Sequence, residues 1–266
     1  MSDPQNKAED ELAGTEQPFV AHLVELRDRL IRMLLAIAVA AIALGLYPGP
    51  GRLYDLLAAP LIATLPTGAT LIATSVISPF MVPLKILLMA AFLIALPVVL
   101  YQLWAFVAPG LYTHEKKLVL PLVVSSTVLF FIGVAFCYFF VFGQVFKFIQ
   151  GFAPKSITAA PDIEAYLTFV LTMFFAFGLA FEVPIAVVVL ARLGVVSVQK
   201  LKDFRGYFWV LAFIIAAIVT PPDVVSQLAL AIPMCVLYEV GIWASRLFIK
   251  HTKAPDAEAE AGTEPS

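Results

Sequence analysis

Three glutamates occupy segments in which a carboxylate could do chemistry. Glu25 lies in HLVELRDRL, Glu115 lies in APGLYTHEKK, and Glu182 lies in the apolar run FGLAFEVPIAVVVL. An acid near the centre of a membrane helix costs about 2.5–3.5 kcal/mol on insertion scales, so such a residue usually faces protein or water. Glu182 is therefore either a structural acid bonded inside a helix bundle or a functional group, such as a proton relay.

The other two glutamates each have a simpler interpretation from the residues alone. Glu25 stands four residues before Arg29, and an ion pair at this spacing stabilises a helix by about 0.2–0.5 kcal/mol. Glu115 is followed by Lys116 and Lys117, whose charge it can balance. A ligand-binding role for either acid stays open beside these interpretations.

The composition places these acids in a membrane protein. The 266 residues are 61% hydrophobic and 14% charged, with a mean hydropathy of +0.95, whereas a soluble domain is about 45–50% apolar and about 25% charged. Two windows of 29 residues, 86–114 and 118–146, carry no Asp, Glu, Lys or Arg. A spanning helix needs about 20 apolar residues. The sequence predicts an all-α polytopic membrane protein with six transmembrane helices, at about 31–48, 80–104, 119–142, 166–190, 207–221 and 225–244.

Lysine and arginine are distributed unevenly between the two sides that this topology defines. The side that holds both termini collects 13 of the 17, and the other side collects Arg52, Lys85, Lys147 and Lys155. Positive residues of short loops remain in the cytoplasm. Both termini of this multi-pass protein are therefore predicted to be cytoplasmic, and the protein is assigned to the cytoplasmic (inner) membrane.

The sequence also predicts how the chain is organised around the spans. Residues 1–18 and 251–266 are acidic and are expected to be disordered cytoplasmic tails that flank a membrane domain at 19–250. Residues 19–35 have the apolar spacing of an amphipathic helix that lies at the cytoplasmic surface and runs into the first span. Residues 54–65 are expected to form a short interfacial helix, and residues 143–165 a long outer loop.

Several features argue against enzymatic chemistry. Cys137 and Cys235 both fall inside apolar spans, which favours core thiols over a disulfide or a metal site. No HExxH, GxSxG or phosphate-binding glycine loop is present, and no catalytic pair for an intramembrane protease. We expect no enzyme activity, no metal or cofactor, and no nucleic-acid partner.

Five sequence blocks carry a resemblance to a known family. HLVELRDRL, SPF, YQLWAFVAPGLYTHEKK, FGLAFEVP and TPPDVVSQ occur in this order along the predicted spans. Together they closely resemble TatC, the polytopic subunit of the twin-arginine protein translocase, over about residues 19–250. The resemblance implies a curved, glove-like arrangement of helices. It also implies a core subunit that binds twin-arginine signal peptides and scaffolds the export of folded proteins driven by the proton-motive force. The implied partners are single-span subunits of the TatA and TatB type, the lipid bilayer, and further copies of the chain.

The resemblance also assigns roles to individual residues. Glu25 and Glu115 match the family's signal-binding acids, and a guanidinium calls for a planar carboxylate partner. The matched blocks add a further group of residues that is expected to complete this site, namely Arg27, Phe106, Pro109, Leu111 and Tyr112.

Other matched positions lie within or between the later spans. Glu182 matches an acid that lines a water-accessible concavity, and Thr220 and Gln227 match a polar site at which a single-span partner docks. Asp223 is expected to cap the hairpin, either as the N-cap of the sixth span or in a functional role. Pro97 lies within an apolar run, where a proline removes a backbone hydrogen bond and bends its helix.

A rival interpretation belongs to a different class of protein. A proton-coupled small-molecule carrier would use Glu182 as its relay. Such carriers are often built from internal repeats with paired helix interruptions, and the sequence has no obvious repeat of this kind.

Overall fold

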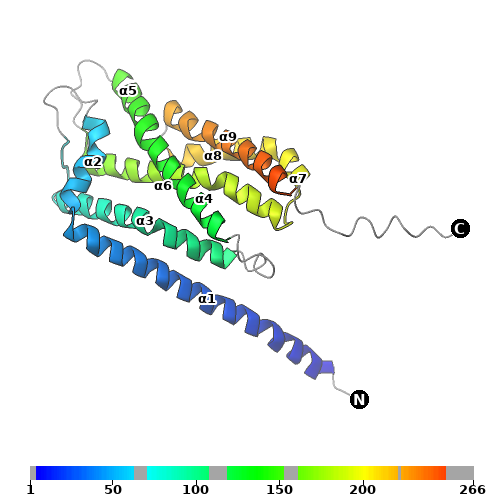
Figure 1. The fold of residues 1–266 in the computed structure, drawn as a ribbon. Coiled ribbons are helices and arrows are strands. Elements are labelled where there is room, and N and C mark those ends of the chain that lie inside the picture. Colours follow the sequence, from blue (N-terminus) through cyan, green and yellow to red (C-terminus); the bar gives the residue numbers. More distant parts are fainter. Residues whose placement is uncertain (1–3, 63–70, 108–118, 153–160, 221–222, 250–266) are drawn as a thin grey trace. The chain divides into compact units, whose positions relative to one another are not determined.

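The regular structure is helical throughout the residues that the computed structural model describes, apart from an isolated parallel bridge between Ile72 and Asp162. The described residues are 4–62, 71–107, 119–152, 161–220 and 223–249, with the side chains of the first helix described from His22 onward. The helices, shown in Figure 1, are α1 (Pro4–Leu46), α2 (Pro50–Ile62), α3 (Ser78–Val107), α4 (Val119–Phe136), the π-helix η3 (Cys137–Val141), α5 (Phe142–Phe152), α6 (Ile163–Arg192), α7 (Val198–Asp203), α8 (Arg205–Val219) and α9 (Val224–Ile249).

Five stretches of helix in the described part of the chain are long and apolar enough to cross a membrane. They are His22–Leu46, Ser78–Val107, Val119–Ile149, Ile163–Arg192 and Val224–Leu247. They coincide with five of the predicted spans and confirm a multi-pass architecture. The remaining predicted span corresponds to α8, whose 15 residues extend about 22 Å against a hydrocarbon core of about 30 Å. A total of six spans stays a prediction.

The N-terminal region forms one continuous helix. α1 joins the predicted amphipathic segment to the first span and already begins at Pro4, inside the segment expected to be a disordered tail. The mobility of that tail and its contact with a membrane surface stay predictions. α2 confirms the short helix expected after the first span, although it begins at Pro50 rather than at Tyr54.

The predicted boundary of the third span was wrong. The helical chain does not end near residue 142 but continues through η3 into α5, which ends at Phe152. Phe142 and Phe146 of α5 are buried, and their rings lie 5.7 Å from those of Phe169 and Tyr166 of α6. Lys147, whose charge closed the apolar window, lies on the exposed side of this helix. The charge therefore marked a change of face and not the end of the helix.

The chain divides into two compact units. The first comprises residues 1–57 and 79–127, and the second comprises residues 58–78 and 128–266. In the first unit α1 runs alongside α3 (Figure 1), and the buried residues of their contact are Ala40, Ala91 and Ala95. Small side chains let helix backbones approach closely, which favours helix association in lipid. The glove-like arrangement concerns both units together and stays a prediction.

The second unit is organised around α6, which contacts η3, α8 and α9. Glycines provide the closest approaches. A Cβ atom at Gly133 of α4 would lie 2.5 Å from the carbonyl oxygen of Phe177, and one at Gly178 of α6 would overlap the ring of Phe130. A Cβ atom at Gly241 of α9 would lie 2.9 Å from the Cα atom of Pro184. Any larger residue would force these helices apart.

A short extended segment fixes the N-terminus of α6 within this second unit. Asp162 is the N-cap, and one of its carboxylate oxygens accepts a hydrogen bond from the Ala165 backbone N–H at 2.9 Å. Its other oxygen accepts from the Thr74 hydroxyl at 2.8 Å and from the Thr74 N–H at 3.2 Å. The bond from Ala165, followed by those from Thr74, holds the pKa of Asp162 below its usual range.

Candidate functional site

Glu25 is bound to an arginine of its own helix. Its Oε1 atom accepts hydrogen bonds from Nη2 of Arg29 at 2.5 Å and from Nε at 2.9 Å, which confirms the pair that the sequence predicts at this spacing. The Glu25 side chain is 43% exposed and that of Arg29 is 17% exposed. The second oxygen, Oε2, lies 4.0 Å from Nδ1 of His22. The carboxylate is thus partly accessible and already sits against a guanidinium.

Two contacts join this part of α1 to the end of α3 within the first unit. Nη1 of Arg29 donates to Oε1 of Gln102, which is buried, at 3.3 Å. The ring of His22 stacks on that of Phe106, with centroids 4.4 Å apart and planes inclined by 14°. The structure therefore brings Phe106 to the same helix face that carries Glu25.

A third contact joins α3 to the start of α4. Trp104 and Ser126 are both buried, and the indole Nε1 of Trp104 donates to the Ser126 hydroxyl at 2.9 Å. The two helices that flank residues 108–118 are thereby linked to each other. Pro97 lies inside α3, two turns before this contact, and is exposed.

Of the remaining members of the predicted signal-peptide site, one lies within the described residues. Arg27 lies on the exposed side of α1, where its guanidinium donates to Oδ1 of Asp28 at 2.8 and 3.0 Å. It does not share the Glu25 carboxylate. The other predicted residues fall outside the described part of the chain, and they are Pro109, Leu111, Tyr112 and Glu115.

Glu182 occupies a different location, in the second unit. It lies in α6 between the close contact at Phe177 and the proline at position 184, and both of its carboxylate oxygens are buried. The next residue, Val183, lines a largely apolar pocket of about 420 Å³ together with Phe204 and Phe208 at the start of α8. Glu182 itself is not among the residues that line this pocket.

The polar residues of the last helical hairpin are used within it. The buried hydroxyl of Thr220 donates to the Ala216 carbonyl at 2.8 Å. The side-chain amide of Gln227 donates to the Phe213 carbonyl at 3.4 Å and so links α9 to α8. A docking role for Thr220 and Gln227 stays a prediction.

Asp223 makes the contact expected of an N-cap. Its Oδ1 atom accepts from the Ser226 backbone N–H at 2.7 Å, and its carbonyl accepts from the Gln227 N–H at 3.2 Å. This geometry supports the capping interpretation at the start of α9.

Sequence reasoning missed the partners that lie far away along the chain. Gln102 bonds to Arg29 across the contact between α1 and α3. It is a polar residue inside an uncharged window of 29 residues, and that unusual placement is the signal by which the sequence could have identified it. The pairing of His22 with Phe106 had no local signal. Within the described residues no group of three or more His, Cys, Asp or Glu side chains comes together to hold a metal ion.

Comparisons with known proteins identify the relatives of this chain. The family model described as Sec-independent protein translocase protein (TatC) matches residues 21–233. TatC of Halothiobacillus neapolitanus is 53% identical over 243 residues, which cover 91% of this chain and 66% of that protein. TatC of Escherichia coli K12 is 47% identical over 233 residues, which cover 88% of this chain and 90% of that protein.

A solved structure extends the similarity to the fold. A crystal structure of a TatC protein, described as a twin-arginine translocase receptor, matches with a TM-score of 0.74 at 40% identity. The match covers 85% of this chain and 98% of that one. None of these comparisons supports a small-molecule carrier. The chain belongs to the TatC family of Sec-independent protein translocase proteins.

Proposed function

We propose that this chain, a component of the twin-arginine protein translocase, binds the paired arginines of signal peptides with Glu25 and Glu115. One observation carries the proposal: the Glu25 carboxylate already accepts two hydrogen bonds from a guanidinium, and its second oxygen lies 4.0 Å from Nδ1 of His22. A site that holds one guanidinium in this geometry can hold another, because charge-assisted contacts between arginine and a carboxylate are strong and directional.

The position of Glu115 supports a shared site. It lies eight residues after Val107, the last residue of α3, and Phe106 near that end is stacked on α1 at His22. The chain between α3 and α4 therefore leaves from a point next to Glu25. Two carboxylates that meet here would match the two positive charges of the signal peptide.

Further parts of the proposal rest on the distribution of charge and on the family. The termini and the Glu25 region lie in the cytoplasm, where 13 of the 17 lysines and arginines are concentrated. Thr220 and Gln227 lie at the α8–α9 hairpin and are the proposed docking point for TatA-like and TatB-like single-span subunits. Glu182 is proposed to face a hydrated groove shared with α8.

Binding of a twin-arginine signal peptide tests the central claim. Losing a hydrogen-bonded charged partner costs about 1.5–3 kcal/mol, so Glu25→Ala should weaken peptide affinity by about tenfold or more. Asp203→Ala is a matched control, because Asp203 is an exposed acid at the end of α7 that accepts a hydrogen bond from Gln199. The Glu25→Ala, Glu115→Ala double variant should no longer crosslink to a precursor while inserting normally into the membrane. Unchanged crosslinking in that double variant would rule out the proposed site.

A further inference from the structure

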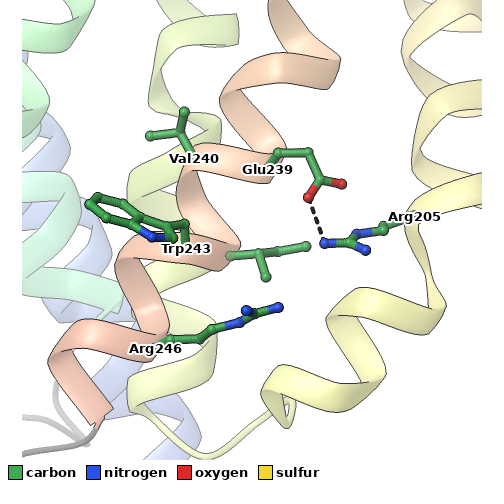
Figure 2. A pocket seen from close by; sticks show the side chains of 6 residues that line it. Arg205, Glu239, Val240, Trp243 and Arg246 are labelled. Carbon is green, nitrogen blue, oxygen red and sulfur yellow. Dashed lines mark hydrogen bonds and ion pairs between the residues drawn. The ribbon is translucent and has the colours of Figure 1, made fainter.

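One pocket outside the proposed peptide site combines positive charge with an apolar helix surface. It lies between the start of α8 and the end of α9 in the second unit and has a volume of about 340 Å³ (Figure 2). The side chains that line it are Arg205, Glu239, Val240, Ile242, Trp243 and Arg246.

The charges of this pocket leave an excess of one positive charge. Nη2 of Arg205 donates to Oε2 of Glu239 at 2.7 Å, so these two groups neutralise each other. Arg246 has no acidic partner among the residues that the structure describes. Figure 2 shows the guanidinium groups of Arg205 and Arg246 reaching toward the same space, one from each helix. The pocket is therefore suited to an anion with a single negative charge.

The surface beside the pocket is apolar along the whole helix face. Val236, Val240, Trp243 and Leu247 recur at helical spacing on α9 and are 57%, 47%, 63% and 48% exposed. In a helix that crosses a membrane, such a stripe meets acyl chains. The two arginines lie at the ends of their helices, since Arg205 is the first residue of α8 and Arg246 lies in the last turn of α9. Headgroups lie at this depth, where tryptophan is also enriched.

We propose that this pocket binds the phosphate group of an anionic phospholipid whose acyl chain lies along the α9 stripe. Guanidinium groups recognise phosphate through directional paired hydrogen bonds, and basic pockets between membrane helices bind anionic headgroups. Glu239 holds Arg205 in place and limits the net charge to +1, which matches a phosphate diester. A free phosphate ion shares this chemistry, but it has no use for the apolar stripe. The inference rests on the membrane location of α9 and not on the signal-peptide site.

Fluorescence quenching by brominated lipids can measure this binding. In the Trp209→Phe protein two tryptophans remain, Trp104, which is buried, and Trp243, which lines the pocket. The protein is placed in phosphatidylcholine nanodiscs that contain an equal fraction of acyl-brominated phosphatidylglycerol or phosphatidylcholine. Brominated phosphatidylglycerol should quench Trp243 more strongly. An arginine near the membrane surface contributes about 1 kcal/mol to the binding of an anionic lipid, so Arg246→Gln should reduce the preference about fivefold.

Control variants separate this site from general surface charge. Lys202→Gln on α7 also removes one positive charge but does not line the pocket, so it should leave the preference unchanged. Arg246→Lys keeps the charge but loses the planar fork, so it should keep part of the preference. Quenching by brominated phosphatidylcholine should be equal in all variants, which shows that Trp243 still faces lipid.

Three results would overturn the proposal. The first is an unchanged preference in Arg246→Gln, and the second is an equal loss in Lys202→Gln. The third is that inorganic phosphate relieves the excess quenching more than chloride does at the same ionic strength. That result would identify a free phosphate as the ligand. Signal-peptide affinity of Arg246→Gln should stay normal, so a failure here is distinguishable from a failure of the Glu25 site.

Discussion

Replacing Arg29 by methionine should increase the affinity of the chain for a twin-arginine signal peptide by about fivefold. Arg29 occupies the Glu25 carboxylate through two hydrogen bonds, of 2.5 and 2.9 Å, so an incoming arginine must displace it or share the carboxylate with it. Methionine keeps a long unbranched stem against α3 but has no charge and no donor. The variant therefore removes the competitor and leaves Glu25 in place.

The expected size of the effect follows from the exposure of the pair. Ion pairs at the surface are worth about 0.2–1 kcal/mol. The Glu25 side chain is 43% exposed but that of Arg29 is only 17% exposed, which places this pair near the upper end of the range. Freeing the carboxylate should therefore improve binding by about 1 kcal/mol, or about fivefold.

Anisotropy of a labelled signal peptide measures its binding to the purified protein. The same measurement in the Glu25→Gln background completes a double-mutant cycle. If the gain acts through Glu25, Arg29→Met should have no effect in that background. The same gain in both backgrounds would mean that Arg29 acts only by general repulsion. Unchanged or weaker binding with Glu25 intact would refute competition for this carboxylate.

Four further predictions concern the fold, the membrane topology and the role of Glu182 in transport. Gly133→Ala should lower the thermal unfolding temperature in detergent, because its Cβ would lie 2.5 Å from a backbone oxygen, whereas Gly143→Ala, with nothing within 4 Å, should leave it unchanged or raise it. The stability that Asp162 contributes should be fully present above about pH 4 and be lost as the pH falls through its lowered pKa, so unfolding scans between pH 6 and pH 3 should show a shallower pH dependence for Asp162→Asn. An impermeant thiol reagent should label cysteine at Val76, which is 98% exposed, from outside intact cells but label cysteine at Val195 only after lysis, and the reverse result would invert the proposed topology. Glu182→Gln, which keeps the shape and hydrogen-bonding capacity of a buried polar group, should support transport, and normal transport by Glu182→Leu at a normal protein level would show that this polar group is not needed.

The course of the helices could be predicted from the sequence because lipid imposes a strong local rule on composition. Windows with no more than one charged residue identified α3, α6 and α9 to within a few residues, since charges are rare within such a span. The same rule failed at Lys147, because a charged residue can lie on the exposed side of a helix that continues. A composition window cannot distinguish the end of a helix from a change of face.

The candidate site could be predicted only where its contacts are local. The spacing of Glu25 and Arg29 indicated their pair, because side chains four residues apart on a helix are neighbours. The contact between Arg29 and Gln102 joins residues that are 73 positions apart. No periodicity encodes such a pairing, which depends on how α1 packs against α3.

The occupied state of Glu25 has a consequence for how a receptor of this kind releases its ligand. A carboxylate that waited empty in a partly buried position would lose little solvation on binding and would hold a signal arginine tightly. Here the resident Arg29 returns to Glu25 whenever the peptide leaves, so binding exchanges one guanidinium for another and the broken resident pair reduces the gain at Glu25. The rest of the affinity must come from the second carboxylate and from contacts around the arginines, such as the His22–Phe106 stack. A moderate affinity built from several weak terms suits a translocase, because a bound precursor must be released for transport. The Arg29→Met protein should therefore bind more tightly mainly through slower dissociation, which the same labelled peptide can report after dilution into excess unlabelled peptide.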